Sequence, residues 1–521
     1  MNQPLRQPRC CVRDIKTAVY QSSPVIIPGD LYLQSPNAKF HKKETFPMRL
    51  MNSRFSLMLV FSLVLVCLAA VPAQAATTTI AGSFADGAKY LIEVPSPWNG
   101  TLLLYSHGYV TPGSANPAQD VGDPGTRAFL LANGFALAGS SYATTGWAIH
   151  EALVDQIAVL DLFNAQVGQP TRTIAWGHSL GGIITAGLIQ RNPKRFDAAL
   201  PMCGVLSGGV ATWNQALDSA FAFKTLFNSG GPLQVVHITN PTGNFLLAEQ
   251  LLAAANATPQ GRARLALANS FGDLPGWFNP ASPEPAANDF ASQAANQFLW
   301  AQQVDFPFIF AFRAELEFRA GGNPSWNTGV NYREQFEHSV NGAEVRALYK
   351  QAGLDLEDDL ETLNKAARIS ADPDAVNYLE QNIIFNGGID FPVLTMHTEG
   401  DGLVSNQNES AYRDVVREAG NERLLRQIFV HRAGHCTFTP AETITALENL
   451  IGRLDTGHWP NLHADALNAE AATLGPLNVA PPSFFLFHPA QFLRPFDAFD
   501  AARCARKHGD NDDGGVPCNA F

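Results

Sequence analysis

The hydrophobic positions of this chain change their period several times, and these changes predict alternating strands and helices. Short apolar runs are typical of strands covered on both faces, and apolar residues three or four positions apart indicate helices. Between residues 76 and 204 the two patterns alternate. The predicted strands are 77–84, 89–94, 101–108, 136–142, 172–176 and 198–203, and the predicted helices are 125–133, 147–167 and the segment after Ser179. This order predicts an α/β protein with a mostly parallel sheet and helices on both faces.

The alternation stops at Gly204 and resumes with an apolar strand at 392–398. The intervening segment, 205–388, reads as a mainly helical lid or cap, with helices at 213–227, 246–255, 290–304, 342–352 and 356–367. The run 306–312 contains four Phe residues. We favour packing inside the insertion as its role; lining of an acyl or aromatic pocket is the alternative.

The alternation returns in the segment 389–457, which completes the core begun at 76–204. It contains the strand 392–398, a helix at 406–419, a strand at 424–430 and a helix at 439–454. The tail, 458–521, is rich in Pro, Phe and Asn and has little period. We expect this tail to wrap around the surface of the domain.

Residues 51–75 have the three parts of a signal peptide. Arg54 provides the positive flank, 55–70 the apolar core, and Ala73-Gln74-Ala75 the cleavage site, so the mature chain is expected to begin near Ala76. A membrane anchor is the competing interpretation, but the apolar run is short for a membrane span. Residues 1–50 are predicted to be an over-extended start or a disordered segment. The protein is therefore expected to be exported, to the cell exterior or the periplasm, with no membrane span after cleavage.

The composition describes a globular chain with a sizeable core, because 46% of residues are hydrophobic and 16% are charged. The formal net charge of -12 argues against a nucleic-acid partner, since phosphate binding needs clustered Lys and Arg. The segment Asp510–Cys518 partly resembles the short excalibur-type calcium loop but departs from it at Gly514 and Asn519. We favour a solvated acidic turn there, and we predict no cofactor and no metal.

The motif Gly177-His178-Ser179-Leu180-Gly181 fits a nucleophile elbow. A β-prone run precedes it and an amphipathic helix follows, which is the context that this motif requires; an ordinary glycine turn is the alternative. A serine hydroxyl needs a base and a residue that orients the base. Asp401, after the first strand beyond the insertion, and His435, after the last strand, follow Ser179 in the order that accompanies this elbow.

With these three motifs in order, the chain from about Lys89 to Leu454 resembles the α/β-hydrolases of the secreted lipase and esterase kind. The resemblance implies a G-x-x-D-x-x-V-like acid loop, which puts the acid on Asp401, with Glu399 as the less favoured substitute. It puts the base on His435. His431, His397 and His107 are expected to be structural histidines.

An oxyanion needs two backbone N–H donors, which we assign to Leu180, after the nucleophile, and to Tyr109, in the loop after an earlier strand. A looser resemblance links the chain to tannases and feruloyl esterases. Those proteins also follow the catalytic His with Cys, but they place a second Cys beside the Ser, where this chain has His178.

The hypothesis from the sequence is a secreted serine esterase that forms an acyl-enzyme with a small-molecule or polymeric ester. A peptidase with the same triad and a non-catalytic binding protein of the same fold are the alternatives. The oligomeric state is left open. Two disulfides are expected in an exported protein: Cys203–Cys436, because both residues fall at the carboxyl edge of the sheet, and the local pair Cys504–Cys518.

Overall fold

The computed structural model describes residues 76–507, and of residues 505–507 it describes the backbone alone. The predictions for residues 1–75 and 508–521, which include the signal peptide and the acidic loop, lie outside these residues. Cys518 also lies outside the described residues, so its pairing with Cys504 stays a prediction.

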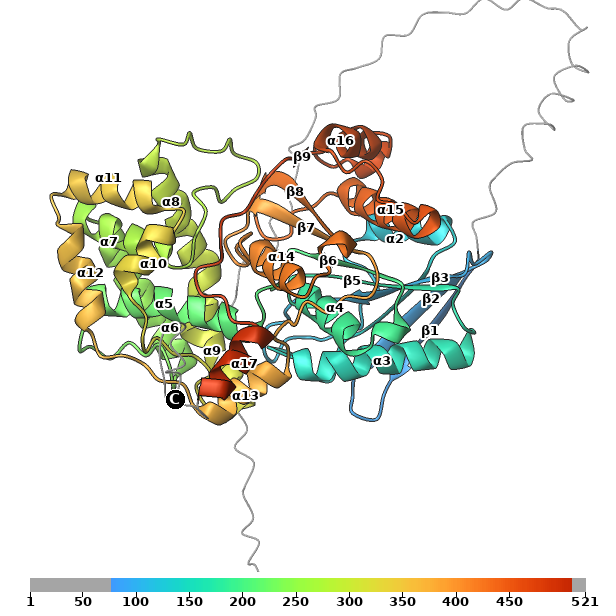
Figure 1. Ribbon diagram of the computed structural model, residues 1–521, viewed down its shortest axis with the longest axis horizontal. Helices are drawn as coiled ribbons and strands as arrows, with labels where there is room; N and C mark the ends of the chain where they lie inside the picture. The colour runs from blue at the N-terminus through green and yellow to red at the C-terminus, as the bar shows by residue number, and fades with distance from the viewer. Residues whose placement is uncertain (1–75, 508–521) are drawn as a thin grey trace, which may run out of the picture. The chain divides into compact units, whose positions relative to one another are not determined.

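A mixed sheet between two layers of helices forms the α/β core of the protein (Figure 1). Among the described residues its strand order is β1-β2-β4-β3-β5-β6-β7-β8-β9, and the strands from β4 to β8 are parallel to one another. The mostly parallel sheet predicted from the sequence is confirmed. The strands are β1 Thr77–Ser83, β2 Lys89–Pro95, β3 Thr101–Ser106, β4 Ala136–Ser140, β5 Arg172–His178, β6 Ala198–Met202, β7 Val393–Gly400, β8 Leu425–Ala433 and β9 Phe484–Phe485.

Helices cover both faces of this sheet, as predicted. Side chains alternate along a strand, so Leu102 and Leu104 of β3 enter one core and Leu103 enters the other. The first core includes side chains of α3, α4 and α14, and the second includes side chains of α2, α15 and α16. Burial on both faces explains why β3 is an uninterrupted apolar run. The helices are α2 Pro124–Ala132, α3 Ile149–Gln166, α4 Leu180–Arg191, α14 Asn408–Glu418, α15 Pro440–Thr456 and α16 Ala464–Ala472.

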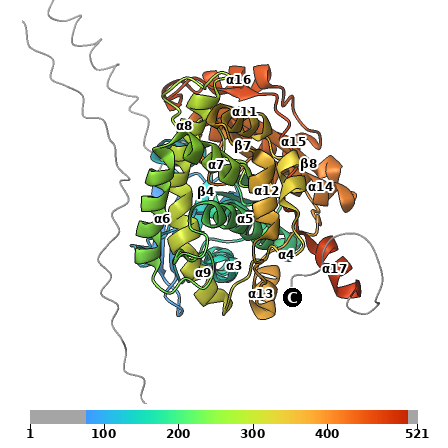
Figure 2. The same ribbon diagram turned by 90° about the vertical axis from the view of Figure 1, so that its left-hand side faces the viewer.

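The segment between β6 and β7 is helical and has a hydrophobic core of its own (Figure 2, green and yellow). Its elements are α5 Gly209–Phe227, α6 Pro241–Asn256, α7 Pro259–Ser270, α8 Phe290–Trp300, η2 Ala301–Asp305, η3 Phe308–Phe312, α9 Arg313–Ala320, α10 Tyr332–His338, α11 Gly342–Ala352, α12 Leu356–Lys365 and α13 Pro373–Gln381. The sequence did not predict α7, because its polar and apolar residues are spread around the helix and leave no clear apolar stripe. The elements η2 and η3 are π-helical turns.

The tail after α15 is more regular than predicted. It contains α16, the short strand β9 and α17 Ala498–Lys507, and β9 pairs antiparallel with β8 at the edge of the sheet. A two-residue strand is too short to leave a period in the sequence. The 3-10 turns are η1 Pro193–Arg195, η4 Glu422–Leu424 and η5 Gly475–Leu477. No helix between residues 76 and 507 combines the length and the apolar character needed to cross a membrane.

Gly181, in the first turn of α4, packs against the end of β3. A Cβ atom at this position would lie 1.9 Å from the carbonyl oxygen of Ser106, so the helix or the strand would have to move. We expect Gly181→Ala to lower the free energy of unfolding by about 2 kcal/mol or more, as overpacked sites do. Urea unfolding followed by circular dichroism measures this change.

Gly452→Ala in α15 is the matched control, because a Cβ atom there would lie at an ordinary 3.5 Å from its nearest neighbour among the described residues, Pro460 Cγ. This substitution should be neutral, or should stabilise the helix by up to about 1 kcal/mol. Equal effects of the two substitutions would contradict the packing argument.

Candidate active site

Ser179 occupies a sharp turn between β5 and α4. Its φ and ψ angles are 59° and -122°, which is a strained conformation for a residue with a side chain. Gly177 permits the turn, because a Cβ atom there would lie 2.5 Å from the carbonyl oxygen of Ser106. The N–H of Ser179 donates to the carbonyl oxygen of Met202 at 3.0 Å. The turn is therefore fixed to the neighbouring strand, with Ser179 at the carboxyl edge of the sheet.

The structure brings Ser179, His435 and Asp401 together in one hydrogen-bonded chain. His435 Nε2 lies 2.7 Å from Ser179 Oγ, and His435 Nδ1 lies 2.7 Å from Asp401 Oδ2. The three residues follow β5, β8 and β7 respectively. Because these strands are parallel, their carboxyl ends meet at one edge of the sheet, and residues from distant parts of the chain can touch there.

Asp401 is held by four polar groups. Its Oδ1 accepts from the backbone N–H groups of Leu403 and Val404 at 3.1 and 3.0 Å, and its Oδ2 faces His435 and His397. Burial alone raises the pKa of Asp401, but the charges and hydrogen bonds of His435 and His397 lower it below its usual value. Glu399, the substitute acid considered from the sequence, instead bonds with His431 Nδ1 at 2.5 Å.

The two residues predicted to form the oxyanion hole lie beside Ser179. Leu180 is the first residue of α4, so its N–H has no acceptor within the helix. The backbone at Gly108 approaches closely, because a Cβ atom there would lie 3.8 Å from Ser179 Oγ. Tyr109 and Leu180 line the same cavity as Ser179. Their positions are compatible with the predicted role.

A mostly apolar cavity adjoins Ser179 and lies between the core and the insertion. Its walls include Tyr109, Trp147, Leu180, Trp213, Phe223, Phe306, Phe308 and Ile309. The Phe run combines both roles considered from the sequence: Phe306 and Phe308 line the cavity, whereas Phe310 is fully buried in the core of the insertion. The rings of Phe308 and Tyr109 lie 5.0 Å apart, so the insertion contacts the predicted oxyanion loop.

Polar side chains that sequence reasoning missed also line this cavity. Gln215 Nε2, Ser219 Oγ, Asp305 Oδ2 and Ser405 Oγ are shielded from solvent and have no hydrogen-bond partner among the described residues. Burial, followed by the charge of Asp401, raises the pKa of Asp305 well above its usual value. Gln215 and Ser219 are four positions apart in α5, on one face of the helix. Such spacing was the available signal, but it does not tell which face meets a cavity.

A disulfide joins Cys203, directly after β6, to Cys436, directly after His435. Both residues have positive φ angles, 42° and 55°.

His178, beside Ser179, takes the place where tannases have a Cys, and its Nδ1 lies 3.1 Å from the hydroxyl of Tyr105. Burial lowers the pKa of His178 to about 4, so this residue is neutral at physiological pH.

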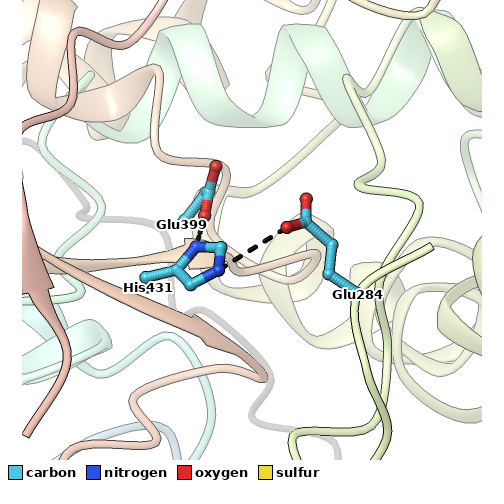
Figure 3. Close-up of side chains that lie close together, drawn as sticks. All are labelled: Glu284, Glu399 and His431. Carbon is cyan, nitrogen blue, oxygen red and sulfur yellow. Dashed lines mark hydrogen bonds and ion pairs between the residues drawn. The ribbon is translucent and has the colours of Figure 1, made fainter. Parts of the chain in front are cut away.

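A second cluster of ionisable side chains lies outside the triad and consists of Glu284, Glu399 and His431 (Figure 3). His431 Nδ1 lies 2.5 Å from Glu399, and His431 Nε2 lies 3.6 Å from Glu284. The imidazole therefore faces a different carboxylate with each of its nitrogens. This geometry fits an ion-pair cluster that joins the insertion to β7 and β8 better than it fits ligands arranged around one metal ion.

The parallel sheet, the serine elbow and the order of Ser179, Asp401 and His435 along the chain define an α/β-hydrolase. No family model matches the sequence. The chain is 32% identical over 427 residues to the o-phthalyl amidase of Xanthobacter agilis, and the match covers 76% of this chain and 91% of that protein. The chain belongs to the family of this amidase, and it is a hydrolase.

Solved structures that are similar to this chain share less of the sequence. An esterase from Aspergillus oryzae is 16% identical with a TM-score of 0.37, and the match covers 74% of this chain and 80% of that one. Feruloyl esterase B from the same organism is 15% identical with a TM-score of 0.35, covering 74% and 81%. The rice cell wall degrading esterase LipA from Xanthomonas oryzae is 14% identical with a TM-score of 0.32, covering 73% and 89%.

Loss of the disulfide should loosen the loop that carries His435. We expect Cys436→Ser to lower kcat by roughly 10- to 100-fold and to change KM little, since a misplaced base affects the transition state more than substrate binding. Steady-state kinetics on a p-nitrophenyl ester measures both constants, with circular dichroism as the control for folding. An unchanged kcat would show that the loop keeps its position without the cross-link.

Proposed function

We propose that the protein is a serine hydrolase that cleaves an ester or amide of an aromatic carboxylic acid through an acyl-enzyme at Ser179. The observation that carries the proposal is the hydrogen-bonded chain from Ser179 through His435 to Asp401, which opens onto a cavity with aromatic walls. The hydrogen bonds to both nitrogens of His435 are those that a general base and its orienting acid require.

In the proposed mechanism Ser179 Oγ attacks the substrate carbonyl while His435 Nε2 takes its proton. Asp401 holds the opposite nitrogen as N–H and stabilises the imidazolium. The N–H groups of Leu180 and Tyr109 donate to the oxyanion. His435 then protonates the leaving alcohol or amine, and an acyl-Ser179 ester remains. Water attacks this ester with His435 again as base, which releases the acid and restores the hydroxyl of Ser179.

The leaving group can be an alcohol or an amine, and the relationship to an amidase favours adding the amide to the ester predicted from the sequence. Both reactions use the same proton transfer from His435. A non-catalytic binding protein has no need of three polar side chains in this geometry. The predicted signal segment and the disulfide support an exported protein.

The lining of the cavity favours a substrate whose acyl group is aromatic and carries a polar substituent. Flat rings pack well against walls such as Trp213 and Phe308, and unpaired polar atoms are costly unless a ligand satisfies them. Gln215, Ser219 and Asp305 offer such atoms. The relative from Xanthobacter agilis is named for an o-phthalyl group, an aromatic acyl group with a second carboxyl carbon next to the first. We propose that an acyl group of this type enters the cavity.

The first test compares p-nitrophenyl benzoate, p-nitrophenyl acetate, a phthalyl or benzoyl amide and an aminoacyl-nitroanilide. We expect the aromatic ester and the aromatic amide to react faster than the other two. Ser179→Ala should lose activity by a factor on the order of a million, as loss of the nucleophile does in such triads. Faster cleavage of the aminoacyl-nitroanilide would favour the peptidase, and no Ser179-dependent turnover would favour the binding protein.

The second test concerns Asp305, whose carboxyl is expected to donate to the substituent because its raised pKa keeps it protonated. Asp305→Leu, which removes the donor at nearly the same size, should change the ratio of kcat/KM for ortho-substituted and unsubstituted benzoyl esters by roughly tenfold, the equivalent of about one hydrogen bond. Asp374→Leu, an exposed position of the insertion, is the control. If both variants keep the wild-type ratio, Asp305 does not contact the substituent.

A further inference from the structure

His397 lies beneath the proposed triad and has no part in the mechanism above. It belongs to β7, four residues before Asp401, and its side chain is fully buried. Its Nε2 lies 2.9 Å from the carbonyl oxygen of Val404 and 3.5 Å from Asp401 Oδ2. Its Nδ1 lies 3.1 Å from Glu409 Oε1. Both ring nitrogens therefore face oxygen atoms.

The partners of His397 determine where its protons are. A backbone carbonyl only accepts hydrogen bonds, so Nε2 must carry a hydrogen atom to bond with Val404. Glu409 has the character of a carboxylate, because its Oε2 accepts from Thr395 Oγ1 at 2.5 Å and from Gln427 Nε2 at 2.6 Å. Its Oε1 then accepts from Nδ1. A neutral imidazole has a single N–H, so two donated bonds require the imidazolium.

The charges around His397 agree with this assignment. Burial lowers the pKa of His397, but the hydrogen bonds and charges of Asp401 and Glu409 outweigh it and raise the pKa to about 10. Burial raises the pKa of Tyr412, beside Glu409, and of Asp305, beside Asp401, so both stay neutral. His435 is a further ionisable neighbour, because its Nδ1 lies 2.7 Å from Asp401 Oδ2.

We propose that His397 is a permanent imidazolium that positions the Asp401 carboxylate, a role that rests on the proposed triad. Two backbone amides hold Oδ1 of Asp401, and both His435 and His397 face Oδ2, at 2.7 and 3.5 Å. The three hydrogen bonds leave the carboxylate little freedom to rotate, and the positive charge of His397 opposes its protonation. Asp401 thus stays ionised and directed at His435 while His435 gains and loses its proton.

The protonation state can be read directly from nitrogen-15 NMR of the full chain with labelled histidine. Both nitrogens of His397 should show the chemical shifts of an imidazolium between about pH 5 and 9, well above the ordinary titration of histidine. Glu409→Gln should remove the second proton, so that one nitrogen becomes unprotonated. A neutral wild-type ring at pH 7 would overturn the proposal. This measurement needs no substrate, so its outcome is independent of the proposed function.

Kinetics tests the positioning role. His397→Gln should lower kcat by roughly 10- to 100-fold with KM nearly unchanged, and it should move the acid limb of kcat to higher pH, because the pKa of Asp401 is lowered less once the charge of His397 is lost. His431→Gln is the matched control: it alters a histidine that also bonds with a glutamate on the neighbouring strand, and both constants should remain near wild type. An equal loss at every pH would indicate a structural role alone.

Stability adds a third measurement. Because the pKa of His397 is raised from 6.5 in the unfolded chain to about 10, its contribution to stability is complete below pH 6.5 and is lost as pH rises through about 10. The difference in Tm between wild type and His397→Gln should therefore shrink from pH 7 to pH 10. The difference between wild type and His431→Gln should stay constant over the same range. A constant difference for both variants would contradict a charged His397.

Discussion

The hydrogen bond between Ser179 and His435 is the contact that the sheet, the turn at Ser179 and the loop of His435 together position. It joins residues 256 positions apart at 2.7 Å, so small displacements of either loop would break it. Parallel strands bring the two loops to one edge, and the close packing of Gly181 on Ser106 sets the direction in which α4 leaves the turn. The sheet therefore fixes where the two loops lie, and the glycines beside Ser179 fix the direction of the turn that carries it. Together they hold Ser179 in a conformation that an isolated chain would avoid.

Strained residues gather around this contact. Ser179, Cys203 and Cys436 all have positive φ angles, each with a cost on the order of 1–3 kcal/mol. The disulfide between the two cysteines closes a loop with a sequence separation of 233, which in the chain-entropy model stabilises the fold by about 5 kcal/mol. A cross-link of this size can offset the strain of its own ends. It also ties the loop of His435 to the strand whose Met202 carbonyl accepts from Ser179.

The sequence predicts the fold and offers candidates for the triad because the signals for both are local. The elbow needs glycines next to Ser179, and Asp401 and His435 directly follow apolar strands, so a short window contains each signal. The residues that line the cavity have no such local signal in the sequence. Gln215 and Asp305 are polar residues on helices, and whether they face solvent or the cavity depends on how the insertion packs on the core. The helix α7 was missed because its polar and apolar residues are not separated onto two faces, so the periodic pattern that reveals a helix is absent.

Asp401 comes from the core and Asp305 from the insertion, and the pKa values of their carboxyl groups are shifted in opposite directions. Asp401, from the core, meets two backbone amides and two histidines, and its pKa is lowered. Asp305, from the insertion, meets mostly apolar walls and the charge of Asp401, and its pKa is raised. The ionised state of Asp401 itself helps to keep Asp305 neutral, because two nearby carboxylates repel each other. In the proposed mechanism the charged acid orients the base and the neutral acid donates to the substrate, and both can act at one site because the insertion packs against the core.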